Sequence, residues 1–318
     1  MAYGGPSRPW CSWFMPLSCV ACIAVFVYTM YVNNCPKNLG EDRCVFHDHL
    51  GRFSFQPRSE NSLFGPSTAT LKKLGGLSRN LVVYDGEIYR FFSCMWLHAN
   101  VIHLLTNSLA ILFIGVKLEE DFGFLRIGLL YVLSGFGGGL LSCLHQDESQ
   151  QTLQISVGAS GALFGLLGAS LSEIITNWTL YTNKCVSITM LILVIGVNMA
   201  IGFMPGIDNM AHIGGFVSGI LLGFILLLRP QYGYVSGPYI APGYELNHKK
   251  PKYQCHQKLL WVISVVVLFV WYTVALSKLY KGERVDLPLP SIDMSKELPS
   301  VGVTQQPSNN THTNLPTN

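Results

Sequence analysis

Seven long apolar runs alternate with polar segments along the chain. They lie at about residues 11–33, 99–117, 124–144, 158–176, 186–204, 210–228 and 258–277. An apolar run of about 17–25 residues is long enough to cross a bilayer as a helix. The pattern therefore predicts an all-α, polytopic membrane protein with seven transmembrane helices. The second to sixth runs form a close block, and longer polar segments separate the first and seventh runs from it.

Charge and polarity suggest how these regions are placed. The short connections that carry Lys117, Arg126, Lys184 and Arg229 are expected in the cytosol, because short cytosolic loops are enriched in Lys and Arg. We expect, in order, a cytosolic N-terminus at 1–10, a first transmembrane helix at 11–33, a long lumenal loop at 34–83, a core at 84–228, a cytosolic linker at 229–257, a seventh transmembrane helix at 258–277 and a disordered tail at 278–318. The alternative for the first run is a cleaved signal peptide.

Composition supports a membrane protein and excludes some functions. Hydrophobic residues make up 49% of the chain and charged residues only 12%, against about a quarter in soluble domains. The 21 Lys and Arg nearly balance the 18 Asp and Glu, so we expect no nucleic-acid partner. The cysteines have no zinc-site spacing, and we expect no metal and no cofactor. Cys35 and Cys44 share the long loop, where both a disulfide and free thiols are open possibilities.

Polar residues at the beginnings of three apolar runs are candidates for chemistry. Ser160 begins the fourth run, at a helix N-terminus where free N–H groups could stabilise an oxyanion. His212 begins the sixth run, and a neutral imidazole is the usual general base for a serine hydroxyl. His103 and Asn107 lie four residues apart on one face of the second run and can donate hydrogen bonds to a developing negative charge.

Glycines predict that the fourth and sixth helices pack closely. Gly215 and Gly219 follow His212 on one helix face, and Gly161 follows Ser160. Small residues at such spacings let two helices approach closely in lipid. We therefore expect Ser160 and His212 to lie at the same membrane level. Taken singly, each residue also fits a purely structural role, as a helix cap, a small packing residue or a hydrogen-bonded histidine.

Three motifs together resemble the rhomboid family of intramembrane serine proteases. They are HANVIHLLTN at 98–107, GASG at 158–161 and AHIGGFVSG at 211–219, and their order and spacing match the family over about residues 84–228. The resemblance implies a rhomboid-like six-helix bundle. The additional C-terminal helix is similar to that of eukaryotic secretory-pathway members. The core at 84–228 would then be the catalytic region.

The resemblance also implies roles for individual residues. Ser160 would be the nucleophile and His212 its base, in a dyad that has no acidic third member. His103, Asn107 and the Ser160 backbone N–H would form the oxyanion hole. Supporting residues would be Gly158, Gly161, Phe164 and His98, with Phe164 stacking on the histidine where the family often has tyrosine. Tyr89-Arg90 stands where the family commonly has Trp-Arg, and we expect this difference to adjust the activity without abolishing it.

These roles imply hydrolysis of peptide bonds in or near the transmembrane segments of single-pass membrane proteins. The expected partners are therefore such substrates and the lipid bilayer. A non-catalytic rhomboid-like protein that binds membrane clients for trafficking or degradation is the alternative. A transporter is disfavoured because the chain shows no inverted repeats. The expected location of this multi-pass protein is the Golgi, plasma membrane or endoplasmic reticulum, and a plastid also fits.

Overall fold

The computed structural model describes residues 9–146, 155–178, 183–202, 208–230 and 253–284. The described residues form one compact unit by their contacts. The predicted tail beyond residue 284 and most of the linker between residues 229 and 257 lie outside the described residues. So do a possible glycosylation sequon in the tail, Asn309-Asn310-Thr311, and a basic cluster in the linker, Lys249-Lys250-Pro251-Lys252. Within the described ranges the chain is helical, and its only β pairings are two isolated bridges, Val45 with Phe55 and Leu77 with Ser156.

Seven helical segments correspond to the seven apolar runs. They are α1 (Phe14–Asn33), the composite α7 (Val101–Ala110), η4 (Ile111–Gly115) and α8 (Val116–Phe122), then α9 (Phe124–His145), α10 (Ser160–Thr176), α11 (Lys184–Gly202), α12 (Asn209–Leu226) and α13 (Cys255–Tyr280). In the described part, five helices are long and apolar enough to cross a membrane, and α10 and α11 are shorter apolar helices. The all-α polytopic fold is therefore confirmed.

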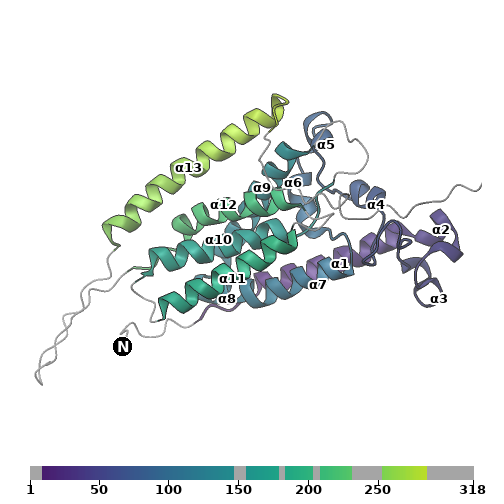
Figure 1. Ribbon diagram of the computed structural model, residues 1–318, viewed down its shortest axis with the longest axis horizontal. Coiled ribbons are helices and arrows are strands. Elements are labelled where there is room, and N and C mark those ends of the chain that lie inside the picture. Colours follow the sequence, from purple (N-terminus) through teal and green to yellow (C-terminus); the bar gives the residue numbers. More distant parts are fainter. Residues whose placement is uncertain (1–8, 147–154, 179–182, 203–207, 231–252, 285–318) are drawn as a thin grey trace, which may run out of the picture. The chain divides into compact units, whose positions relative to one another are not determined.

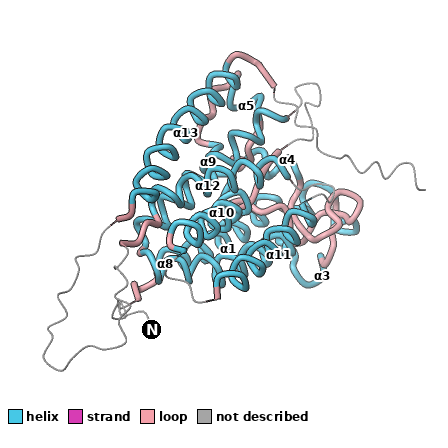
Figure 2. Tube along the Cα trace, turned by 60° about the vertical axis from the view of Figure 1, so that its left-hand side comes forward, coloured by secondary structure: helices cyan, strands magenta, loops and turns pink. Residues whose placement is uncertain are grey.

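The closest contact in the bundle joins α10 to α12, which lie side by side in Figures 1 and 2. A Cβ atom at Gly215 would lie 2.0 Å from the carbonyl oxygen of Gly161, and one at Gly219 would lie 2.1 Å from that of Gly165. Real Cβ atoms do not come this close to backbone, so these positions admit only glycine without a shift of the helices. The predicted glycine packing between the fourth and sixth helices is present.

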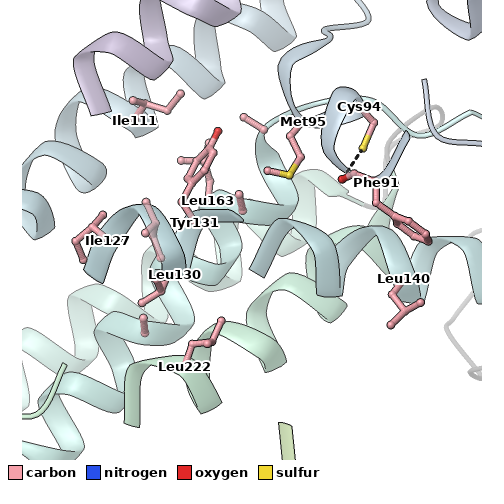
Figure 3. Packing of buried hydrophobic residues seen from close by; sticks show 14 of the residues in the cluster. Phe91, Cys94, Met95, Ile111, Ile127, Leu130, Tyr131, Leu140, Leu163 and Leu222 are labelled. Carbon is pink, nitrogen blue, oxygen red and sulfur yellow. Dashed lines mark hydrogen bonds between the residues drawn. The ribbon is translucent and has the colours of Figure 1, made fainter. Parts of the chain in front are cut away.

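Helix α9 packs across α10 and α12 and supplies much of the apolar core. Figure 3 shows Tyr131, Leu130 and Ile127 of this helix beside Leu163 and Leu222 from the other two. The side chains of Ile127, Leu130 and Tyr131 are fully buried. The same helix approaches α12 through glycine, because a Cβ at Gly138 would lie 2.6 Å from the Ala211 carbonyl oxygen. Three helices thus form a tight centre around which the others lie.

The second apolar helix is longer than predicted. Its expected end was residue 117, where charged residues begin, yet the helix continues to Phe122 after a π-helical turn at Ile111–Gly115. The reason is Glu119, which is fully buried and accepts hydrogen bonds from the backbone N–H groups of Phe14 and Met15, each at 2.8 Å. A carboxylate at the N-terminus of α1 satisfies amides that have no partner within that helix.

The C-terminal helix α13 packs against α9 and α12. Tyr272 donates a hydrogen bond to the Leu133 carbonyl at 2.8 Å, and Trp271 donates one to the Ser218 hydroxyl at 3.3 Å. The helix starts at Cys255, three residues before the predicted start, because Gln254 and Gln257 form a reciprocal capping box. Most of its apolar surface is not covered by protein, as expected for a helix that faces lipid.

The segment expected as a long loop at 34–83 is folded. It contains α2 (Cys35–Leu39), η1 (Glu41–Arg43), α3 (His47–Leu50), η2 (Gly51–Phe53), α4 (Thr68–Lys73) and α5 (Arg79–Val83), and α6 (Arg90–Ser93) and η3 (Cys94–Trp96) follow before α7. The structure joins Cys35 to Cys44 in a disulfide. These turns are too short to show a helical period in the sequence, which explains why they were not predicted.

Substitution of Gly215 tests the helix contact. We expect Gly215→Ala to destabilise the protein by about 1–3 kcal/mol, because the added methyl group overlaps backbone that cannot move freely. The matched control is Gly196→Ala on α11, where a Cβ meets no atom within 4 Å. Thermal unfolding in detergent micelles should show a lower midpoint for Gly215→Ala only. Equal midpoints for the two variants would contradict the close contact.

Candidate active site

Ser160 is the first residue of α10, and the chain before it is fixed by backbone hydrogen bonds. The N–H of Gly158 donates to the Cys94 carbonyl at 2.9 Å, and Ser156 pairs with Leu77 in an isolated bridge. Gly158 has φ = 129°, a conformation that residues with a side chain rarely adopt. The backbone therefore turns sharply just before the serine and places it at the start of a helix that has no side-chain cap.

The Ser160 hydroxyl oxygen lies 2.9 Å from Nε2 of His212. His212 lies in the first turn of α12 and is only 6% exposed. Phe164, one turn after Ser160, stacks on the imidazole with ring centroids 4.3 Å apart and an interplanar angle of 18°. The ring is thus held against the serine by a face contact on one side and a hydrogen bond at its edge, as a serine and its general base require.

Asp208 caps α12 and does not extend this pair. Its carboxylate accepts a hydrogen bond from the Ala211 N–H at 3.0 Å and another from the Ser142 hydroxyl. The second ring nitrogen of His212, Nδ1, is buried and has no hydrogen-bond partner among the described residues. The hydrogen-bonded unit at this site therefore has two members, Ser160 and His212.

His103 and Asn107 lie beside the turn that precedes Ser160. A Cβ at Gly158 would lie 2.5 Å from Cε1 of His103 and 3.5 Å from Nδ2 of Asn107, so only glycine fits between them and the serine. Asn107 is 6% exposed, and its Nδ2 is a buried donor with no partner in the described part of the chain. Burial without a partner is unfavourable for such a donor, because its hydrogen bonds to water are lost.

His98 supports this arrangement from the segment before α7. Its ring lies edge-on to that of His103 with centroids 5.2 Å apart, and its Nδ1 is 3.3 Å from the Trp96 carbonyl oxygen. Asn100 caps α7, because its Oδ1 accepts from the His103 N–H at 2.8 Å. The three helix starts at Val101, Ser160 and Asn209 thus meet at one end of the bundle, and all predicted site residues lie there or along the α10–α12 contact.

The loop before α7 is held by Arg90. This side chain is almost fully buried and donates to the carbonyls of Lys72 and Gly76, each at 2.7 Å, and it pairs with Glu87. Tyr89, in contrast, is 53% exposed. Tyr89 is therefore a surface residue, while Arg90 stabilises the loop from within.

Two residues with clear structural roles were not singled out from the sequence. Glu119 lies just beyond the expected end of the second run at residue 117, and its carboxylate fixes α1 to α8. Ser142 lies within the third apolar run, and its hydroxyl donates a hydrogen bond to the Asp208 carboxylate that caps α12. The only sequence feature that pointed to this contact was the position of Asp208, three residues before Ala211, which is the spacing of a helix N-cap. In the described residues, no group of three His, Cys, Asp or Glu could hold a metal ion.

Comparison with known proteins gives the family. The model of the Rhomboid domain matches residues 85–229. The chain is 52% identical to RHOMBOID-like protein 5 of Arabidopsis thaliana over 277 residues, 87% of this chain and 88% of that protein. It is 41% identical to Inactive RHOMBOID-like protein 8 of A. thaliana over 225 residues, 69% of this chain and 61% of that protein. It is 33% identical to Rhomboid-type serine protease 2 of Emericella nidulans over 158 residues, 48% of this chain and 31% of that protein.

These matches agree with the architecture, in which a six-helix bundle is followed by one further apolar helix. Family and fold together make this a multi-pass membrane protein, and the chain belongs to the rhomboid family.

Proposed function

We propose that the protein is an intramembrane serine endopeptidase that acts through a dyad of Ser160 and His212. The observation that carries this proposal is the 2.9 Å contact between the serine oxygen and Nε2 of the imidazole. Both residues stand at the starts of apolar helices, where a hydroxyl and an imidazole have no evident structural need to meet. Ionisable groups at membrane depth are unfavourable and usually mark function.

The geometry suggests a sequence of steps. Neutral His212 accepts the hydroxyl proton as Ser160 Oγ attacks the carbonyl carbon of the scissile bond, which gives a tetrahedral oxyanion. His212 then gives that proton to the leaving amine, the C–N bond breaks, and an acyl-enzyme remains. Water, deprotonated by the same imidazole, attacks the ester carbon; the ester C–O bond then breaks, and His212 returns the proton to Ser160 Oγ as the new carboxyl terminus leaves.

Donors for the oxyanion lie on one side of the serine. Nδ2 of Asn107 is buried and unpartnered within the described structure, and the imidazole of His103 lies beside it against Gly158. The Ser160 N–H stands at the positive end of the α10 dipole. Preorganised donors of this kind stabilise the transition state more than the substrate, because the charge develops only as the bond to serine forms.

The position of the serine limits the class of substrate. Helix α10 has 17 residues. Its length is therefore about 25 Å, against about 30 Å for the hydrocarbon core. Ser160 then lies slightly below one membrane surface. A helical substrate hides its carbonyls in hydrogen bonds, so we propose single-pass membrane proteins whose helix unwinds near that surface, at small or helix-breaking residues.

We also propose an orientation. The N-terminus lies in the cytosol, and Ser160, His212 and the disulfide-bonded segment face the opposite side. Disulfides persist in oxidising compartments, which supports the secretory pathway, in the Golgi, plasma membrane or endoplasmic reticulum. A plastid also fits the topology.

A non-catalytic role is the second candidate, and one relative is named inactive. Such a protein would bind membrane clients for trafficking or degradation without cutting them. The contact between Ser160 and His212 favours the enzyme, because a binding protein has no use for an activated hydroxyl. Labelling of Ser160 by a fluorophosphonate would support catalysis, and no labelling in any lipid would support the binding role.

Removal of either dyad residue tests the proposal. We expect Ser160→Ala and His212→Ala each to reduce cleavage of a single-pass model substrate by at least about 1,000-fold, since the nucleophile and base act as a unit. The control is Ser170→Ala on the same helix, whose hydroxyl donates to the Leu166 carbonyl. Cleavage in reconstituted vesicles, measured by gel, should persist only in the control. Undiminished cleavage by either dyad variant would refute the mechanism.

Asn107→Ala tests the oxyanion donors separately. We expect kcat to fall by about 100-fold or more with little change in KM, because the lost bond forms mainly in the transition state. Asn198→Ala on α11, whose exposed amide donates to the Val194 carbonyl, is the control and should retain full activity. A rise in KM with unchanged kcat would instead indicate that Asn107 contacts the bound substrate.

A further inference from the structure

Residues 34–66 form a closed structure, here named the insert, whose two ends meet at Asn33. The fully buried Oδ1 of Asn33 accepts hydrogen bonds from the Ser67 N–H at 2.9 Å, the Thr70 hydroxyl at 3.0 Å and Gln56 Nε2 at 3.2 Å. The chain therefore leaves α1 at Asn33 and returns beside it at Ser67. The insert lies before residue 85, where the match to the family domain begins.

The insert is stiffened from within. The Cys35–Cys44 disulfide closes its first part, and Val45 pairs with Phe55 in a backbone bridge. The rings of Phe46, Phe55 and Phe64 lie in mutual contact, with centroids 5.6–6.4 Å apart. A folded and cross-linked structure of this kind can hold a neighbouring segment in place, which a flexible loop cannot do.

The insert binds the segment that leads into α7. Asn61 Nδ2 donates to the Ala99 carbonyl at 2.8 Å, and the Val101 N–H donates to the Phe64 carbonyl at 2.9 Å. The two backbones are in direct contact, because a Cβ at Gly65 would lie 2.1 Å from the Ala99 carbonyl oxygen. Figure 1 shows α2 and α3 of the insert beyond the end of α1.

This segment sets the position of the proposed oxyanion donors. Ala99 lies between His98, whose ring contacts that of His103, and Asn100, which caps the helix through the His103 N–H. Val101 is the first residue of α7, and Asn107 follows on the face of His103. A shift of Ala99 or Val101 therefore moves both donors relative to Gly158 and Ser160.

We propose that Asn61 is a positioning residue for catalysis, and that the insert holds the start of α7 so that His103 and Asn107 face the oxyanion. The inference rests on the proposed function, because it assigns a catalytic consequence to a contact outside the membrane helices. Asn61 acts through the Ala99 carbonyl and does not touch the reacting atoms. Its two amide hydrogens make it a donor to both Ala99 and Pro66, at 2.8 and 3.1 Å.

Two substitutions of Asn61 separate hydrogen bonding from packing. Asn61→Asp keeps the shape and removes both donors, and Asn61→Ala removes the side chain. We expect both to lower kcat by about 10- to 100-fold with KM unchanged, since a displacement of about 1 Å at the reacting groups can reduce the rate about 100-fold. The matched control is Asn38→Ala, which removes an insert asparagine that donates to the Asn33 carbonyl at 2.8 Å. Its kcat should stay within about twofold of wild type.

A double-mutant cycle distinguishes positioning from general destabilisation. If Asn61 acts through the oxyanion donors, Asn61→Ala should add little to the loss already caused by Asn107→Ala. Losses that multiply in the double variant would overturn the proposal. So would a loss in Asn38→Ala equal to that in Asn61→Ala.

A measurement without catalysis keeps the inference separate from the proposed function. In a Ser160→Ala background, Asn61→Ala should speed hydrogen exchange of the Val101 and His103 amides, and Asn38→Ala should leave it unchanged. Unchanged exchange in Asn61→Ala would overturn the positioning role even if the enzyme cleaves substrate. Faster exchange together with no cleavage by wild type would instead support the contact and refute the proteolytic function.

Discussion

The structure depends on the absence of side chains between α10 and α12. Gly161 and Gly165 face Gly215 and Gly219 so closely that the two helices touch through their backbones. In lipid, where apolar burial drives little helix association, such contact supplies dispersion and close dipole interactions. The distance from Ser160 to His212 is therefore set by main-chain atoms, which vary less than side-chain rotamers. Four glycines therefore limit how far apart the Ser160 hydroxyl and the His212 imidazole can be.

The site also depends on which ends of the helices come together. The N-termini of α7, α10 and α12 meet, so the positive ends of three helix dipoles point to one region. Asn100 and Asp208 cap two of these helices, whereas α10 begins at Ser160 without a side-chain cap. The uncapped helix is the one that carries the serine. In the proposed mechanism, its free amides are available to the negative charge that develops on the substrate.

Much of this arrangement could be predicted from the chain. Apolar runs gave six of the seven helical segments to within about three residues, because a bilayer imposes a long and uniform pattern. Polar residues at the starts of apolar runs pointed to the candidate site, because few purely structural roles would place a serine, two histidines and an asparagine there.

The features that were not predicted have a different cause. The end of the second helix depends on Glu119 and on backbone amides about a hundred residues earlier, and no local pattern reports such a contact. The fold of the insert depends on Asn33, Gln56 and Thr70, which are ordinary polar residues until the chain brings them together.

The π-helical turn at Ile111–Gly115 has a consequence for how one helix serves two partners. An α-helix advances by about 100° per residue, so one additional residue in a turn rotates everything after it by that angle. Before the turn, His103 and Asn107 face the serine, and after it, Glu119 faces the first turn of α1. Winding the same residues as a regular α-helix would turn Glu119 by about 100° relative to His103 and Asn107, away from the first turn of α1. The π-helical turn thus lets one helix present His103 and Asn107 to the segment before α10 and Glu119 to the start of α1.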